Sequence, residues 1–548
     1  MGLFGTIRCM RAAQSLSAAV MVVVVSALVG GLFGGRALAT QDRVAERYKV
    51  FSNALAAIEA NYVEEVDTDR LVYGAINGML QTLDPHSSFM DPRTYSQMRE
   101  RQEGRYYGLG ITIQVQDGDI TVMALFDGAP AHQEGIRRGD VIAEIEGESA
   151  SGWTSDQAVR RLRGPKGSPV NIAIRRQGYD ELIPLEVTRD EVSIPTIRGA
   201  FMVNASTGYV RLRDFSETTD DDLGLALEDL AGQGMQQLLL DLRDNPGGPL
   251  DQAIRVANRF LPRGDMIVYT RGRIPNSDQD YHASEESDFT DLPLVVLVNR
   301  NSASASEIVA GAIQDHDRGL IVGETTFGKA LVQSIYRVSE GAGLALTTAR
   351  YYTPSGRLIQ RPWDGTFDEY LMYSMRDQEA DRQHSSTDLK YTDAGRQVYS
   401  AGGIEPDEFM AGPVEGFDPT PIGRRLFARQ AFPRYAQKYS AIGDTRIREQ
   451  GRDRVLVDRD FDMTDEIVDD FMQFLAQERV AIDVDALADD AAFVRAMIRY
   501  TIDLDLFGEV DARRHLVEVD PQAKFALTLF DKAEALTRLA RPGQPVEP

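Results

Sequence analysis

The sequence contains almost no cysteine. Cys9 is the single cysteine in 548 residues, and it lies near the N-terminus. The rest of the chain can therefore form neither an intrachain disulfide nor a cysteine-based metal site. Histidine is also scarce, with six residues, so a nucleophile that needs a histidine base has few candidates for a partner.

Positive charge is the second shortage. The chain has 59 Lys and Arg residues against 84 Asp and Glu residues, which gives a formal net charge of -25. Such a surface repels nucleic acid and favours solubility. The hydrophobic content of 43% is that of a globular protein. The length exceeds one hydrophobic core and predicts two to four domains.

Acidic residues are absent before Asp42, where a long apolar stretch lies. Arg8 and Arg11 precede the run, which extends over about 12–38 and includes "AVMVVVVSALVGGLFGG". A basic start followed by an apolar segment predicts a signal peptide or membrane anchor over 1–40. "ALA" at 37–39 fits a cleavage site, but the length of the run favours an uncleaved anchor. We therefore expect export to a periplasm or cell envelope, with anchoring in the inner membrane, and an envelope protein of this size can rely on its core without disulfides.

Three changes of pattern divide the rest of the chain. Apolar residues at helical spacing predict helices over 41–103. Short strand-like runs separated by glycine-containing turns predict a β-rich module over 104–190. Alternating strands and helices over 191–410, several strands being almost wholly apolar, predict an α/β core. A polar insertion at 361–401 interrupts this core, and amphipathic helical runs predict a helical region over 411–548. The expected fold is therefore multidomain α+β.

Three serines stand on alternate positions where a buried strand meets a helix. "PLVVLVN" reads as the strand and "ASEIVAGAIQDH" as the helix, so Ser302, Ser304 and Ser306 surround the turn between them. Open α/β sheets place their sites at such carboxyl ends of strands. A serine nucleophile there needs a base. His316 lies twelve residues beyond Ser304, about 18 Å along a straight helix, so a Ser-His-Asp triad is disfavoured.

A lysine can serve as the base if burial leaves it uncharged. Lys329 stands between Gly328 and Ala330, soon after the strand-like "LIVGE", and small neighbours allow it to pack into a dry site. A single lysine is more often a solvated surface residue. "DLRDNPGG", at 241–248, ends another buried strand. Its glycines let backbone N–H groups approach a ligand, as an oxyanion hole requires.

These segments together resemble the carboxyl-terminal processing proteases, also called tail-specific proteases. The resemblance rests on "SASASEIVAGAIQDH", "GETTFGKALVQ", "DLRDNPGG" and "YYTPSGRLIQ", and on their order and spacing. "LDPHSSFMDP", "GYVRLRDFSETTDDDL" and "GGIEPD" extend it over about 48–407. Several separated motifs in the right order make it specific. It implies a ClpP/crotonase-like α/β protease core, expected over 191–410.

The resemblance implies a Ser-Lys dyad. It assigns the nucleophile to Ser304 and the base to Lys329. Gln333, placed one helical turn after Lys329, matches a glutamine that supports the dyad.

The same resemblance implies an oxyanion hole made by the backbone N–H groups of Gly247, or Gly248, and Ala305. Ser302 and Ser306 are then structural: Ser302 is expected to bond the turn and Ser306 to cap the helix. Periodicity alone does not separate the three serines.

The β-rich module resembles a PDZ domain. "GLGI", Gly108, Leu109, Gly110 and Ile111, matches the loop whose N–H groups receive a peptide's terminal carboxylate, with the next strand accepting the peptide by β-augmentation. Arg163 stands where the family has an arginine that links the position of the PDZ domain to the active site. The alternative interpretation is that Arg163 is an ordinary surface charge without this role.

Taken together, the sequence predicts an exported serine endopeptidase that recognises substrate C-termini and cleaves nearby. Its partners would be protein or peptide substrates with accessible C-termini, with no nucleic acid and with no metal or organic cofactor implied. The oligomeric state stays open, a homo-oligomer included. Two other classes are weighed: a non-catalytic PDZ scaffold, against which a complete dyad speaks, and a crotonase-like acyl-transfer enzyme, which would leave the PDZ domain, Ser304 and Lys329 without a use.

Overall fold

The computed structural model describes residues 45–126, 128–176, 178–338, 341–363, 370, 372, 384–412, 421–443, 458–480 and 490–540. The chain divides into two compact units, Met1–Leu83 and Asp84–Pro548. The segment expected to be a leader or anchor, 1–40, lies outside the described residues. Across the residues that are described, no helix combines the length and apolar character that crossing a membrane requires.

The first unit contains two helices in its described part. One spans 45–61 and the other is α2 (Thr68–Gln81). Helix α2 begins where it does because the Asp67 carboxylate accepts a hydrogen bond from the Arg70 N–H (3.1 Å).

The second unit opens with strand β1 (Ser88–Met90) and helix α3 (Pro92–Glu103). Asp91 caps α3 by accepting from the Thr94 N–H (2.7 Å), and Pro92 occupies the first turn, where no donor is needed. Gly104, at φ +67, ends the helix. The described part of 45–103 thus contains helices at 45–61, α2 and α3, and β1 interrupts them.

The β-rich module is an antiparallel sheet in the order β3-β4-β5-β7-β8, with β6 paired to β5. The strands are β3 (Ile111–Gln116), β4 (Asp119–Leu125), β5 (Val141–Ile145), β6 (Glu148–Ser149), β7 (Pro169–Arg175) and β8 (Ile183–Thr188), with helices α4 (Pro130–Gln133) and α5 (Ser155–Leu162). A separate pair, β2 (Arg105–Gly108) and β9 (Asp190–Ser193), joins the two ends of the module. Strand β3 stays an edge strand, which leaves one side available for pairing.

A six-stranded sheet, in the order β10-β11-β12-β15-β16-β21, forms the α/β core. Its strands are β10 (Ile197–Met202), β11 (Thr207–Leu212), β12 (Gln237–Asp241), β15 (Leu294–Val298), β16 (Leu320–Gly323) and β21 (Glu408–Phe409). All pairs from β11 onward are parallel. Every residue of β15 is buried, because helices cover both faces of the sheet, and this explains its unbroken apolar sequence.

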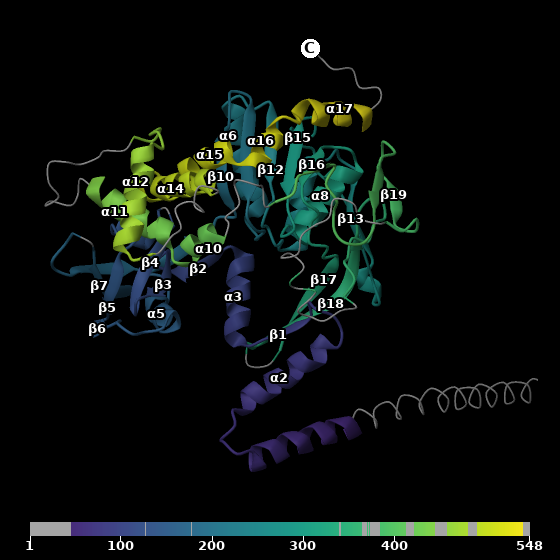
Figure 1. The fold of residues 1–548 in the computed structure, drawn as a ribbon. Helices are drawn as coiled ribbons and strands as arrows, with labels where there is room; N and C mark the ends of the chain where they lie inside the picture. The colour runs from purple at the N-terminus through teal and green to yellow at the C-terminus, as the bar shows by residue number, and fades with distance from the viewer. Residues whose placement is uncertain are drawn as a thin grey trace, which may run out of the picture. The chain divides into compact units, whose positions relative to one another are not determined.

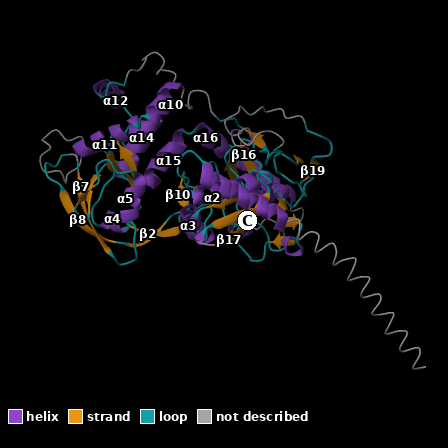
Figure 2. Ribbon diagram, turned by 90° about the horizontal axis from the view of Figure 1, so that it is seen from below, coloured by secondary structure: helices purple, strands orange, loops and turns teal. Residues whose placement is uncertain are grey.

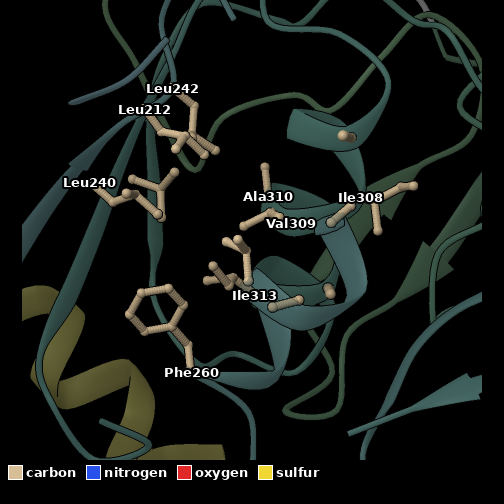
Figure 3. Packing of buried hydrophobic residues seen from close by; sticks show 14 of the residues in the cluster. Leu212, Leu240, Leu242, Phe260, Ile308, Val309, Ala310 and Ile313 are labelled. Carbon is tan, nitrogen blue, oxygen red and sulfur yellow. The ribbon is translucent and has the colours of Figure 1, made fainter. Parts of the chain in front are cut away.

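Helices α6 (Thr219–Gly232), α7 (Leu250–Asn258) and α8 (Ala305–Asp315) belong to this core. Figure 3 shows Val309, Ala310 and Ile313 of α8 facing Leu240 and Leu242 at β12, with Phe260 closing the cluster. These side chains are almost completely buried. The packing fixes α8 against the end of β12, which is where Ser304 and the glycine loop lie.

The opposite face of the core sheet is covered by the end of the chain. Helices α16 (Pro521–Leu527) and α17 (Phe530–Ala540) place Ala523, Ala526 and Phe530 against Leu239, Val295 and other residues of the sheet. In Figure 1 these helices lie over β15 and β16. The C-terminal region is therefore partly a layer of the protease core.

A second sheet, β1-β18-β13-β14 with β17 paired to β18, flanks the core. Its strands are β13 (Met266–Gly272), β14 (Gln279–His282), β17 (Leu331–Arg337) and β18 (Gly343–Tyr352), with a short 3-10 helix, η1 (Pro275–Ser277), before β14. The described part of the polar insertion contains a hairpin, β19 (Leu389–Tyr391) and β20 (Gln397–Tyr399).

The remaining C-terminal helices are α10 (Pro421–Ala428), α11 (Ala431–Gly443), α12 (Asp465–Gln477), α14 (Ala491–Leu506) and α15 (Glu509–Val519). Most pack around an aromatic-rich cluster that includes Phe432, Tyr435 and Phe471. Figure 2 shows α11 and α14 beside the β-rich module. An ion pair between Arg138 and Asp505 (2.8 Å) joins the two parts.

Candidate active site

Ser304 occupies a strained position at the start of α8. It is the N-cap residue, with φ +57 and ψ -111, a conformation that residues with a Cβ rarely adopt. Strain of this kind persists only where the surroundings enforce it, and it is commonly found at active sites. Here the buried strand β15 and the packed helix α8 hold both ends of the turn.

The glycine loop after β12 lies directly on Ser304. A Cβ at Gly247 would stand 2.7 Å from the Ala303 carbonyl oxygen, 2.8 Å from the Ala305 nitrogen and 2.8 Å from the Ser304 Cβ. Gly247 also has φ +93. Both its conformation and its surroundings therefore require glycine.

The predicted oxyanion donors differ in their partners. The Gly247 N–H donates to Asn245 Oδ1 (2.8 Å). The N–H groups of Gly248 and Ala305 donate to no described residue. Two backbone donors beside the serine are thus available to an incoming oxygen, while that of Gly247 is engaged.

Glu307 joins the serine turn to the lysine loop. Its buried carboxylate accepts hydrogen bonds from the backbone N–H groups of Ser304 (2.8 Å), Gly328 (2.7 Å) and Lys329 (2.9 Å), and from Thr326 Oγ1 (2.6 Å). Burial raises the pKa of Glu307, although these donors oppose the shift. Our sequence reading missed Glu307; the Ser-x-x-Glu spacing from Ser304, typical of a capping box, could have revealed it.

Lys329 lies partly buried beside the Glu307 carboxylate. Burial lowers its pKa, while the carboxylates of Glu307 and Asp84 act in the opposite direction. The Tyr351 hydroxyl hydrogen-bonds the carbonyl oxygens of both Ser304 (3.1 Å) and Lys329, so one side chain holds the two backbones together. No hydrogen bond joins Ser304 Oγ to Lys329 Nζ, and Nζ donates to no described residue.

Gln333 lies in a strand. The expected helical turn after Lys329 is instead β17, in which Gln333 follows a bulge in the pairing with β18. The segment "LVQSIYR" carries β-branched and aromatic residues and pairs along its length, which explains the difference. The Gln333 amide donates to Thr347 Oγ1 (3.3 Å), and the Thr347 N–H donates to Ser87 Oγ (3.1 Å).

The motif "LDPHSS" supplies further residues at the site. The Asp84 carboxylate accepts from the backbone N–H groups of His86 and Ser87 (both 2.8 Å) and from Ser87 Oγ (2.7 Å), which fixes the loop. Asp84 and His86 both lie close enough to Lys329 for their charges to interact. Neither residue was predicted at the site, because no local sequence pattern links residues 84–87 to the lysine loop.

The side chains of the other two serines and of His316 have hydrogen-bond partners outside the proposed dyad. Ser302 Oγ donates to the Leu242 carbonyl (2.8 Å) and accepts from the Asn299 N–H (2.9 Å). Ser306 lies inside α8, where its hydroxyl donates to the Asn245 carbonyl (3.1 Å) and does not cap the helix. Both ring nitrogens of His316 are engaged, with Asp393 and with the Met266 carbonyl (2.7 Å each).

The loop Gly108–Ile111 is covered by an aromatic side chain. The Tyr106 hydroxyl lies within reach of the Gly110 and Ile111 N–H groups, and burial raises its pKa. A Cβ at Gly108 would stand 2.9 Å from the Tyr106 ring. Arg163 stacks on that ring (4.8 Å to the centroid) and pairs with Glu100 of α3 (2.6 Å). Arg163 therefore connects the β-rich module to the segment that precedes it.

The described residues contain no group of three or more histidine, cysteine, aspartate or glutamate side chains arranged to hold a metal ion. The chemistry available at this site is that of a serine, a lysine, two free backbone donors and buried carboxylates. Such a set suits attack on a carbonyl carbon.

Comparison with protein families gives three matches. "Peptidase family S41" covers residues 206–366, "PDZ domain" covers 97–175, and "Activating protease CtpB N-terminal domain" covers 35–94. Ser304 and Lys329 fall inside the first of these ranges, and Gly108–Ile111 falls inside the second.

Two curated proteins are similar over most of their own length. A carboxy-terminal-processing protease of Bartonella bacilliformis is 42% identical over 315 residues, which are 57% of this chain and 72% of that protein. The carboxy-terminal processing protease CtpA of Bacillus subtilis is 33% identical over 349 residues, with 62% and 73% covered. Among solved structures, a photosystem II D1 C-terminal processing protease is 28% identical and covers 68% of this chain and 95% of that one, with a TM-score of 0.34.

Proposed function

Because the chain belongs to the carboxy-terminal processing proteases of peptidase family S41, and is thus a serine-type peptidase with a PDZ domain that acts on protein or peptide substrates, we propose that Ser304 and Lys329 are its catalytic dyad. One observation carries the proposal: the Glu307 carboxylate binds the backbone N–H groups of both residues. The serine turn and the lysine loop are therefore held by one anchor.

The proposed reaction moves one proton between the two side chains. Lys329 Nζ takes the proton of the Ser304 hydroxyl while Oγ forms a bond to the scissile carbonyl carbon. The ammonium then gives this proton to the leaving amine as the C–N bond breaks, and water hydrolyses the acyl-enzyme. Since no hydrogen bond joins Oγ to Nζ in this structure, the two groups must approach each other before the first step.

The developing oxyanion would be stabilised by backbone donors beside Ser304. Ala305 and the Gly247–Gly248 pair supply them. The donor of Gly248 is free, and that of Gly247 becomes available if the Asn245 side chain gives up its hydrogen bond. Gln333, on β17, would support the site indirectly, because its partner Thr347 is hydrogen-bonded to Ser87 of the "LDPHSS" loop.

Substrate selection would begin at the PDZ domain. A free C-terminal carboxylate would dock on the N–H groups of Gly108–Ile111 and the peptide would extend along the open edge of β3. Peptide binding there would change the contacts of Arg163 with Tyr106 and with Glu100 of α3, and would thereby affect the position of α3. The basic, apolar N-terminal segment of the sequence supports placement in the cell envelope with an inner-membrane anchor, in reach of envelope proteins.

The dyad is tested by peptide cleavage. Ser304→Ala and Lys329→Ala should each abolish hydrolysis of a fluorogenic peptide while circular dichroism and the melting temperature stay close to those of the wild type. Lys329→Arg should also be inactive, because guanidinium stays protonated. Wild-type kcat/KM should rise with pH as the lysine loses its proton. Ser385→Ala and Lys390→Ala, in the insertion, serve as controls with unchanged activity. Full activity of the Ser304 or the Lys329 variant would refute the assignment.

A further inference from the structure

The loop that carries Lys329 is enclosed by a hydrogen-bonded network that the proposed reaction does not use. The Ala330 N–H donates to Gln360 Oε1 (2.8 Å), and Gln360 Nε2 donates to the Tyr370 hydroxyl (3.0 Å). That hydroxyl also meets His86 Nε2 (2.8 Å). Tyr370 comes from the polar insertion and His86 from the "LDPHSS" loop, so two distant segments meet at the backbone of the loop that carries Lys329.

The donors and acceptors of this network can be assigned. Gln360 Nε2 donates both to the Arg361 carbonyl (2.9 Å) and to Tyr370, so both of its protons are used. Tyr370 is 5% exposed. Its own proton therefore needs a protein acceptor, and among the described residues His86 Nε2 is the one within reach. This makes His86 the tautomer that carries its proton on Nδ1.

Aromatic packing holds the same segments in place. The Tyr370 ring meets the His86 ring edge-on at 5.4 Å and the Phe327 ring edge-on at 5.7 Å. The Arg361 guanidinium stacks on both Phe327 (4.3 Å) and Tyr370 (4.6 Å), and the Arg361 N–H donates to the Gly328 carbonyl (2.9 Å). The loop 327–330 is thus covered on the side of the insertion.

The charges around Lys329 affect whether its amine can act as a base. The titratable groups that face Lys329, His86 or their contacts are Glu307 of α8, Asp84, Tyr351 of β18, Arg361 and Tyr370. Glu307 and Asp84 favour the protonated lysine, which is the wrong form for a base. Burial, together with the nearby Lys329, lowers the pKa of His86 to about 4, so the imidazole is neutral near pH 7 and adds no charge.

We propose that His86 and Tyr370 are positioning residues for the reaction: as a hydrogen-bonded pair they cover the Lys329 side chain, exclude water from it and thereby keep its amine unprotonated. Neither residue touches the scissile bond. Their effect passes through Lys329, because the carboxylates beside it would otherwise hold the ammonium. The proposal rests on the assignment of Lys329 as the base.

The test is the pH dependence of kcat/KM for His86→Ala and Tyr370→Ala. Opening the cover should hydrate Lys329, so the rising limb should move to higher pH, by about one unit, with about tenfold lower activity at pH 7. Activity should return at alkaline pH. Tyr370→Phe, which keeps the ring, should shift the limb less, and His86→Gln, which keeps an acceptor for the tyrosine proton, should restore part of the wild-type profile.

Controls separate this role from simple loss of folding. His282→Ala, at an exposed position of β14, should leave the profile unchanged. The double variant His86→Ala/Tyr370→Phe should be no more impaired than His86→Ala, since partners in one bond are not additive. The proposal would be overturned if folded His86→Ala kept the wild-type pH dependence of kcat/KM, or if it lost activity equally at every pH. If Lys329→Ala were itself active, the dyad would fail instead, so the two failures are distinguishable.

Discussion

Gly247 is constrained both by its backbone conformation and by its neighbours. Its φ of +93 excludes an ordinary side chain, and an added Cβ would collide with the Ala303–Ala305 backbone. The residue can therefore change only if the serine turn moves. Because Ser304 itself holds a strained conformation, the two loops depend on each other.

Gly247→Ala should therefore remove activity with little loss of fold. Strain at such a φ costs about 1–3 kcal/mol, and displacing one oxyanion donor costs about 10²–10³ in kcat. We expect kcat to fall at least about 100-fold, measured with a fluorogenic peptide. Gly395→Ala is the matched control, since φ is +82 there but open space surrounds the missing Cβ. Equal activities of the two variants would show that the loop contact does not matter.

The sequence predicted the core strands correctly but did not place some individual residues. The strands of the core could be predicted because buried parallel strands read as apolar runs. Gln333 was misplaced because four-residue spacing suggests a helix, whereas pairing with β18 makes the segment a strand. His86 was not predicted at the site, because about 240 residues separate it from Lys329 in the sequence and the pairing of β1 with β18 brings the two segments together. No local pattern encodes that contact.

At the scale of the element, a side chain already lies over the N–H groups of the loop Gly108–Ile111. Tyr106, two residues before it on β2, lies over the N–H groups that a peptide carboxylate would use. A docking C-terminus must therefore move this side chain, and moving it also disturbs the stacking of Arg163 and its pairing with Glu100. Ligand binding would then be coupled to α3 without any contact between ligand and α3.

We expect Tyr106→Ala to strengthen the preference for substrates with a free carboxylate. The measurement is kcat/KM for matched acid and C-terminally amidated peptides. In the wild type the acid should be the better substrate, and in Tyr106→Ala the ratio should rise because no side chain has to be displaced. Arg163→Ala should lower the ratio while docking persists. A ratio that falls to one in Tyr106→Ala would mean that the tyrosine helps to bind the carboxylate.

At the scale of the whole molecule, the C-terminal helices are part of the protease core. Arg243, at the end of β12, donates to Gln522 Oε1 (3.0 Å) and pairs with Asp520 (2.8 Å), so the start of α16 is tied to the strand that leads into the glycine loop. Burial would raise the pKa of Asp241 on the same strand, but Arg243 and Arg211 outweigh it and hold that pKa well below the usual range. The end of the chain thus supports the site.

Phe530→Ala, on α17, should destabilise the protein by about 3–5 kcal/mol, because the ring is almost fully buried against the sheet. Leu536→Ala should cost about 2–5 kcal/mol for the same reason. Chemical denaturation monitored by circular dichroism measures both. Leu539→Ala is the control on the same helix, since that side chain is 68% exposed, and it should stay within about 0.5 kcal/mol of the wild type. A stable Phe530→Ala variant would show that α17 is dispensable to the core.

This arrangement sets an order of events during synthesis. Ser304 and Lys329 leave the ribosome long before the segment that covers the far face of their sheet, since α16 and α17 follow them much later in the sequence. Domains generally fold as their residues emerge, but here one apolar face of the sheet stays open until residues 521–540 have been made. A nascent or truncated chain would carry the catalytic residues on an unfinished scaffold. Activity would then depend on α16 and α17 being in place against the sheet.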